Sequence, residues 1–239
     1  MSEERAPRRG PVLGVFAHPD DAEIAAGGTL ASWAAGGREV HLFVLTNGDR
    51  GSGDPGASRE QLAITRKAET EAAGDVLGLA SVRILSIHDG ELQNTLAVQE
   101  AVIRRIREVR AETVVSVDPT AVFFEDRYYN HSDHRTAGWI ALDSVFPGSG
   151  NPHFFAEHFG EGLRPQDVYD VWLGWTNEPN HVEDVSATFG AKIDALACHA
   201  SQLSEGIRHF EESLREEAVT TGEKIGVALA EEFRVLDLS

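Results

Sequence analysis

Cysteine is nearly absent from this chain, since Cys198 is its only one among 239 residues. A single thiol excludes an internal disulfide and any metal site built from several cysteines. Basic residues are also scarce: 21 lysines and arginines face 39 acidic residues, and the formal net charge is −18 at pH 7. Because such a chain repels a phosphate backbone, we expect no nucleic-acid partner.

Long apolar runs are missing as well. No stretch of about 18 consecutive apolar residues occurs, so the sequence encodes no span of a bilayer. The first ten residues are polar and charged and lack the apolar segment of a secretory signal, which predicts a disordered leader over residues 1–10. Together with the lack of disulfides, these features favour a cytoplasmic protein.

The most informative stretch runs from residue 12 to residue 33. Its apolar start, VLGVFA, predicts a buried strand that ends at HPDD, residues 18–21, an imidazole followed by two carboxylates. An alanine-rich helix is predicted over residues 22–35 and ends at two glycines. The loop after a strand is a ligand-binding position in an open α/β sheet, although paired aspartates at a helix start also serve as simple caps.

A second polar cluster follows another apolar run, at residues 113–117. This cluster, YYNHSDHR at residues 128–135, contains His131, Asp133 and His134 within four residues. It has no apolar pattern that a hydrophobic core could use. The two clusters together predict a metal site assembled from two loops.

Strands and helices alternate through most of the chain. Further strands are predicted at residues 40–45, 82–85 and 168–175, and helices at residues 58–77, 96–110, 134–145 and 189–203. Alternation of this kind predicts βαβ units and therefore an α/β fold, with a mostly parallel, Rossmann-like sheet flanked by helices and a C-terminal elaboration. No repeat or linker marks a second domain, so residues 11–239 are expected to form a single one.

The two polar clusters resemble those of the LmbE-like or PIG-L family of zinc-dependent N-acetylglucosaminyl deacetylases. A-H-P-D-D-x-E at residues 17–23 is the specific match, and H-x-D-H at residues 131–134 is the second. Weaker similarities are GGTL at 27–30, Arg66 with Glu69, ACHASQ at 197–202 and AEEFR at 230–234. The resemblance implies hydrolysis of the acetamide bond of an N-acetylglucosamine-type conjugate, which releases acetate and a free amine.

The resemblance also implies the metal ligands, which are His18, Asp21 and His134. Two neutral imidazoles and one carboxylate fill three positions of a tetrahedral zinc ion and leave the fourth for water, as in catalytic zinc sites. Zinc bound in this way makes hydroxide available near neutral pH and polarises an amide carbonyl. Ferrous iron suits the same ligands.

Four further residues are assigned catalytic roles through the resemblance. Asp20 matches the general base, and His131 is expected to stabilise the oxyanion and to protonate the leaving amine. Asp133 is expected to hold His131 in the required tautomer, and Tyr129 to donate to the oxyanion, although Tyr129 is equally compatible with a surface aromatic. Ser132 departs from the proline usual in this motif, which loosens the expected geometry around His131.

Several residues keep two interpretations. Arg66 and Asp89 match substrate-binding positions of the family, but a solvated helix face and a turn explain them as well. The arginines at 104, 105, 107 and 110 are balanced by glutamates and are expected on a solvated face. Residues 46–56 form a surface loop or a substrate rim, residues 147–166 form a lid or a packed loop, and the role of His199 stays open.

Three alternatives compete with the deacetylase interpretation. An amidase that acts on a thiol-sugar conjugate uses the same chemistry on another acceptor. A non-haem iron oxygenase also uses two histidines and a carboxylate, but its usual spacing and its all-β scaffold differ from this chain. A non-catalytic metal- or sugar-binding module would have no need of Asp20 and His131. The expected partner is a small amino-sugar conjugate, and the resemblance is compatible with a homo-oligomer.

Overall fold

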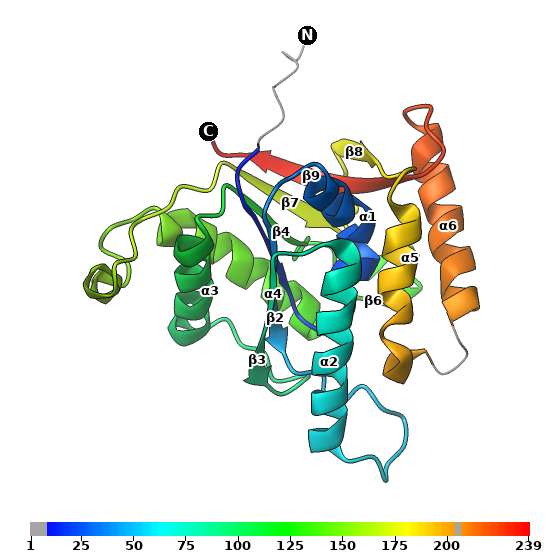
Figure 1. Cartoon of the computed structure of the whole chain (residues 1–239), viewed down its shortest axis with the longest axis horizontal. Coiled ribbons are helices and arrows are strands. Elements are labelled where there is room, and N and C mark those ends of the chain that lie inside the picture. Colours follow the sequence, from blue (N-terminus) through cyan, green and yellow to red (C-terminus); the bar gives the residue numbers. More distant parts are fainter. Residues whose placement is uncertain (1–8, 204–206) are drawn as a thin grey trace.

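The computed structural model describes residues 9–203 and 207–239. Its centre is a seven-stranded sheet in the order β3-β2-β1-β4-β7-β9-β8 (Figure 1). The strands are β1 (Val12–Phe16), β2 (Val40–Thr46), β3 (Ser81–Ile87), β4 (Thr113–Val117), β7 (Asp170–Gly174), β8 (His181–Asp184) and β9 (Ala230–Asp237). The first five of these are parallel, whereas β9 runs antiparallel to both β7 and β8. The expected mostly parallel α/β fold is confirmed.

Helices cover both faces of the sheet. One face carries α3 (Leu96–Val109) and α4 (Ser132–Asp143), and the other carries α1 (Asp21–Ala35), α2 (Arg59–Leu77), α5 (Phe189–Ala197) and α6 (Ile207–Glu223) (Figure 1). Two buried apolar clusters fill the space between the sheet and these layers. Strands β1, β2 and β4 are buried along their whole length, which explains their continuous apolar sequences.

Most elements begin and end where the sequence predicts. The side chain of Ser58 accepts a hydrogen bond from the backbone N–H of Gln61 and caps α2, and Gly78 ends this helix with a left-handed φ of 74°. The C-terminal third differs more from the prediction. The helix expected over residues 189–203 ends at Ala197 and is followed by a 3₁₀ turn, η3 (Ala200–Gln202), and the sequence analysis identified neither α6 nor the antiparallel strands β8 and β9.

Glu231 connects the C-terminal elaboration to the first helix. Its carboxylate accepts hydrogen bonds from the backbone N–H groups of Gly28 and Thr29 and from the Thr29 hydroxyl, and it pairs with the buried Lys192 at 2.7 Å. A Cβ atom on Gly28 would lie 2.7 Å from the Cβ of Val185, so only glycine permits this close approach. These contacts link the GGTL segment to the AEEFR segment.

Two of the arginines expected on a solvated face are buried, so that expectation was wrong for Arg105 and Arg107. The guanidinium of Arg107 donates to the carbonyls of Gly148, Ser149, Asn151 and Phe154. It also contacts the fully buried His158, which lies in the 3₁₀ helix η2 (Ala156–Glu161) and pairs with Glu100. These contacts anchor residues 148–154 and His158 to α3, whereas residues 159–162 are exposed.

The ends of the chain bear on two further predictions. Residues 1–8 of the predicted leader lie outside the described residues, whereas the carbonyl of Gly10 accepts a hydrogen bond from Arg38. The division into a leader and a single domain stays a prediction. Within residues 9–203 and 207–239, no helix combines the length and the apolar character that a bilayer span requires.

Candidate active site at the carboxyl edge of the sheet

Histidines and aspartates converge at the carboxyl ends of the parallel strands. His18 follows β1, Asp89 follows β3, and His131, Asp133 and His134 lie at the start of α4, beyond β4. Strands β1 and β4 are neighbours in the sheet, although β2 and β3 separate them in sequence. Their exit loops meet at the topological switch point, where open α/β sheets bind ligands.

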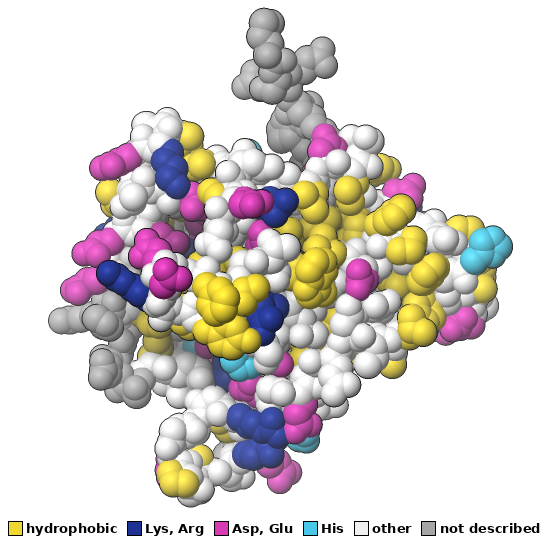
Figure 2. Space-filling view, turned by 180° about the vertical axis from the view of Figure 1, so that it is seen from behind, with side chains coloured by type: hydrophobic (Ala, Val, Ile, Leu, Met, Phe, Trp, Pro, Cys, Tyr) yellow, Lys and Arg dark blue, Asp and Glu magenta, His cyan; other side chains and the backbone are white. Residues whose placement is uncertain are grey.

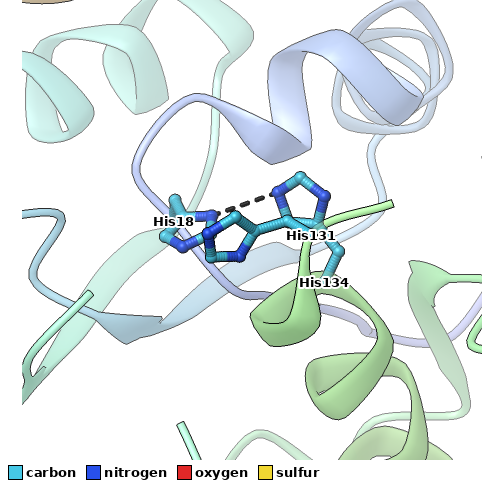
Figure 3. A group of neighbouring side chains, drawn as sticks. All are labelled: His18, His131 and His134. Carbon is cyan, nitrogen blue, oxygen red and sulfur yellow. Dashed lines mark hydrogen bonds between the residues drawn. The ribbon is translucent and has the colours of Figure 1, made fainter. Parts of the chain in front are cut away.

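Three side chains form a compact donor set. Nδ1 of His18 lies 3.1 Å from Nε2 of His134 and 3.5 Å from Oδ2 of Asp21, and Oδ1 of Asp21 lies 3.2 Å from Nε2 of His134. Figure 3 shows His18 from the β1–α1 loop facing His131 and His134 from the start of α4. Ligand atoms about 2.0–2.1 Å from a tetrahedral zinc ion are about 3.3 Å apart, close to the separation of the two histidine nitrogens and to that of each histidine from its nearer Asp21 oxygen.

The other ring nitrogens of these histidines face oxygen atoms. Nδ1 of His134 lies 3.0 Å from Oδ1 of Asn130, a fully buried amide whose Nδ2 donates to the carbonyl of Ala121. Nε2 of His18 lies 3.1 Å from Asp89 and 3.4 Å from Asp133. Such contacts select the tautomer that directs the opposite nitrogen toward a metal. The sequence analysis missed Asn130, because a lone amide in a polar loop carries no distinctive signal.

Charge within the cluster fixes the state of Asp21. Burial by itself opposes ionisation, but the charges of His134 and His18 hold the pKa of Asp21 well below its ordinary value. Asp21 also accepts a hydrogen bond from the backbone N–H of His18 at 2.8 Å. The carboxylate is therefore ionised near neutral pH, as a metal ligand must be.

Asp20 sits beside this donor set in a strained conformation. Its φ of 102° lies in the left-handed region that a side chain disfavours. Strain of about 1–3 kcal/mol per residue is typical of functional sites whose surroundings impose it. Burial raises the pKa of the Asp20 carboxyl to about 7, against the opposing charge of Arg66. A group with this pKa can accept a proton near neutral pH.

Arg66 holds the loop that carries Asp20. Its guanidinium is buried and donates to the carbonyls of Gly48 and Pro19 and to Oδ2 of Asp20, the last at 3.2 Å. The solvated-face interpretation of Arg66 was therefore wrong. Its described contacts are with the protein itself, and they favour a positioning role over direct substrate binding.

His131 and Asp133 interact differently from the expectation. Nδ1 of His131 accepts a hydrogen bond from the backbone N–H of Asp133 at 3.1 Å, so the backbone sets the tautomer and leaves the proton on Nε2. The carboxylate of Asp133 accepts from the backbone N–H of Gly90 at 2.7 Å and faces His18. The expected support of His131 by the Asp133 side chain is thus corrected, since this side chain supports His18.

Burial and the two neighbouring imidazoles lower the pKa of His131. A neutral ring whose Nε2 carries the proton can donate a hydrogen bond near neutral pH. Nε2 of His131 lies 4.0 Å from Oδ1 of Asp89. Asp89 thereby faces both His18 and His131, so it belongs to the same cluster as the metal donors.

The tyrosine next to the cluster is Tyr128. The hydroxyl of Tyr129 accepts a hydrogen bond from Arg135, and its side chain is 61% exposed on the hairpin of β5 (Phe123–Phe124) and β6 (Tyr128–Tyr129). Burial and the charge of Asp21 raise the pKa of Tyr128. Tyr128 also lines a pocket with Trp175, whose ring centre lies 5.0 Å from that of His134. These contacts make Tyr128 a better candidate than Tyr129 for an interaction with substrate.

Part of the loop over residues 46–56 is fixed by a buried carboxylate. Oδ2 of Asp49 accepts from Arg59 and contacts His88, while Oδ1 accepts from the backbone N–H of Asp89. Asp49 is 3% exposed, so the start of this loop is anchored, whereas residues 52–56 are exposed. Asp49 therefore positions the turn that carries Asp89.

His199 forms a buried pair with Glu23 behind Asp20. Its Nε2 lies 3.7 Å from Oε1 of Glu23, and the two side chains are 1% and 0% exposed. No described residue provides a hydrogen-bond partner for the side-chain nitrogens of His199 or the carboxylate oxygens of Glu23. Although burial opposes it, Glu23 raises the pKa of His199. The nearby Ser201 donates two hydrogen bonds to Glu69 of α2.

The fold and the site define a class: an α/β enzyme with clustered histidines and aspartates at the carboxyl edge of its sheet. The family model for PIG-L, described as GlcNAc-PI de-N-acetylase, matches residues 13–145. The diacetylchitobiose deacetylase of Thermococcus kodakarensis is 32% identical over 224 residues, which are 93% of this chain and 82% of that protein. The chain belongs to the PIG-L, or LmbE-like, family.

Two further comparisons agree. The 1D-myo-inositol 2-acetamido-2-deoxy-alpha-D-glucopyranoside deacetylase of Rhodococcus opacus is 31% identical to this chain. The match covers 85% of this chain and 83% of that protein. The structure of the N,N′-diacetylchitobiose deacetylase from Pyrococcus horikoshii, in complex with an inhibitor, has a TM-score of 0.87 and 31% identity over 96% of this chain and 84% of that one. These relatives are deacetylases, which are hydrolases of amide bonds.

Proposed function

We propose that this protein is a zinc-dependent hydrolase that removes the acetyl group from an N-acetylglucosamine-type conjugate. The observation that carries the proposal is the donor set of His18, Asp21 and His134, with separations of 3.1–3.5 Å, beside a carboxyl whose pKa is about 7. The relatives that resemble the chain over most of its length are deacetylases. They favour this activity over the thiol-sugar amidase, the iron oxygenase and the binding module.

His18, Asp21 and His134 would hold the ion. When bound, zinc supplies Lewis-acid polarisation of the amide carbonyl and makes water more acidic near neutral pH. Ferrous iron suits the same two nitrogens and one carboxylate, so the choice of zinc is part of the proposal. Asp133 and Asp89 orient the ring of His18, and Asn130 orients that of His134.

Proton transfer is assigned to Asp20 and His131. Asp20 removes a proton from the attacking water, because its carboxyl is held between burial and Arg66 at a suitable pKa. His131 donates from Nε2 to the oxygen that gains charge as the carbonyl is attacked. The proton taken up by Asp20 then passes to the departing amine, directly or through His131.

Replacing Asp20 by asparagine tests the assignment. We expect the variant to retain zinc and to lose about 10²- to 10⁴-fold in kcat, as is typical when a general base is removed. Asp21→Asn should instead lose zinc, and Asp54→Asn, at an exposed loop position, serves as the control. Amine release from N-acetylglucosaminyl conjugates is measured with metal-stripped protein, after zinc and then iron are restored. Hydrolysis by zinc-loaded Asp20→Asn at the wild-type rate would reject Asp20 as the base.

Three expectations from the sequence are not addressed by the geometry of the site. A cytoplasmic location, a homo-oligomeric state and the absence of nucleic-acid partners stay predictions from the sequence. The site does not favour a direct contact of substrate with Arg66 or Tyr129, because these side chains bind Asp20 and Arg135.

A further inference from the structure

A pocket of about 620 Å³ opens beside the proposed metal site. It starts at Trp175, which contacts the ring of His134, and it is bounded by α1, β9, α6 and the β5–β6 hairpin. Ile24 and Ala25 of α1 line it directly after the metal-binding segment. Its volume lies within the range of about 300–1,000 Å³ that is usual for small-molecule sites. The pocket therefore lies next to the reaction centre, with Trp175 between it and His134, and it is larger than the acetyl group requires.

Aromatic side chains form one part of the pocket wall. Phe124 and Tyr128 come from the hairpin, Trp175 follows β7, and Phe210 lies on α6. Tyr128 and Phe210 are 52% and 40% exposed, so their rings present apolar surface to an occupant. Flat aromatic faces suit a ring that carries both C–H and hydroxyl groups, because the apolar face packs on the ring while the polar edge stays hydrated.

A second part of the wall carries charged side chains, most of them acidic. Four glutamates and one lysine line the pocket among the described residues. Glu231 is neutralised by Lys192, and Glu232 pairs with Lys224. No ion pair within the described part of the chain involves the other two, Glu125 and Glu217, which are both exposed. Figure 2 shows acidic side chains gathered on the side of the molecule where α6 lies.

We propose that this pocket holds the group attached to the reacting sugar, and that Glu125 and Glu217 make it select an uncharged or cationic hydroxylated group over an anionic one. The proposal rests on the proposed function and deepens it. Carboxylates accept hydrogen bonds from hydroxyl and ammonium groups, whereas a second carboxylate or a phosphate would be repelled.

Three substrates test the selection: N-acetylglucosamine, the neutral N,N′-diacetylchitobiose and the anionic N-acetylglucosaminyl malate. We expect the wild-type enzyme to show a KM at least about tenfold lower for diacetylchitobiose than for the malate conjugate. Glu217→Gln, and more strongly Glu125→Gln/Glu217→Gln, should lower the KM for the malate conjugate roughly three- to tenfold, because a repulsive charge is removed. A higher salt concentration should reduce the difference, since exposed charges are screened.

Glu216→Gln is the matched control. This residue is also an exposed glutamate of α6 but does not line the pocket, and it carries the same change in charge. It should leave the KM ratio of the two conjugates at the wild-type value. The proposal would be overturned if Glu217→Gln and the double variant left the ratio of the two KM values unchanged. A wild-type preference for the malate conjugate would also overturn it.

The failure of the proposed function has a different signature. If zinc-loaded enzyme releases no amine from any of the three substrates, the deacetylase assignment itself fails. Calorimetric binding of glucosaminyl-N-acetylglucosamine and glucosaminyl malate to the zinc-loaded protein then provides the same comparison without turnover. Equal affinities for these two compounds would overturn the pocket assignment, and a preference for the first that Glu217→Gln weakens would support it.

Discussion

Replacing Arg66 by methionine tests whether a buried cation sets the working pH of this site. The substitution keeps much of the length of the side chain and removes its charge. Arg66 lowers the pKa of Asp20, which burial raises to about 7. Without the guanidinium, the ionised carboxylate loses its partner and the pKa rises further. The acid limb of the profile of kcat/KM against pH should therefore move to higher pH.

The size of this shift follows from the distance between the two groups. Nη2 of Arg66 and Oδ2 of Asp20 are 3.2 Å apart. Two unit charges at this distance interact by about 5 kcal/mol at an effective dielectric constant of about 20, which equals about four pH units. The side chain of Asp20 is 20% exposed, so water screens part of this interaction. We expect a shift of about one to three pH units, the range usual for one opposite charge.

The assay is the pH dependence of amine release by zinc-loaded protein, with the zinc content measured at each pH. A bound cation lowers the pKa of Asp20 in both proteins, so the informative quantity is the difference between them. Lys67→Met is the control, because Lys67 is the next residue of α2 but pairs with Glu71 on the surface. Arg66→Lys should keep the acid limb near its wild-type position. An Arg66→Met limb within about 0.3 pH unit of wild type, with zinc bound, would refute the reasoning.

Three further predictions concern stability. The pKa of His199 is raised in the folded state, so its contribution is complete below its ordinary value of about 6.5 and is lost as pH rises through the folded value. His199→Gln should therefore flatten the decline of the unfolding free energy above about pH 6.5. His181→Gln is the control. If both variants show the same slope of unfolding free energy against pH, the prediction is contradicted. Arg107→Met should lower the unfolding free energy in urea by about 1–3 kcal/mol and preserve kcat, because buried carbonyls lose their donor. Arg104→Met should change stability little, because its ion pair with Glu161 lies at the surface. Removal of zinc by a chelator should lower the Tm by roughly 8–16 °C, relative to protein in the presence of free zinc at about 1,000 times its Kd. A Tm that does not depend on zinc would argue against zinc binding by the native state.

Strain and burial at residues 18–21 have a common explanation. Asp20 adopts a left-handed φ, and Asp21 folds back to accept the N–H of His18, so consecutive carboxylates face different partners. Asp21 reaches the two histidines of the donor set, and Asp20 reaches Arg66. The proposed roles of Asp21 as a metal ligand and of Asp20 as a base require this divergence.

The first two-thirds of the fold could be predicted because its signals are local. Apolar runs over residues 12–17, 40–45 and 113–117 are buried on both faces and therefore appear as continuous hydrophobic sequence. Caps such as Ser58 and Gly78 act within one turn of the helix that they end. The C-terminal third was harder to predict from the sequence. Strand β9 pairs antiparallel with β7 and with β8, and long stretches of chain separate it from both partners.

The sequence by itself determined the types of the reactive residues and their attachment to strand ends, since His18, Asp20, Asp21, His131 and His134 stand in two short motifs. Only the tertiary structure decided how they face one another. Asp133 turned toward His18, Tyr128 replaced Tyr129 beside the cluster, and Arg66 came to Asp20 from another helix. The physical reason is that orientation and pairing depend on burial and on contacts between segments tens of residues apart, which no local pattern encodes.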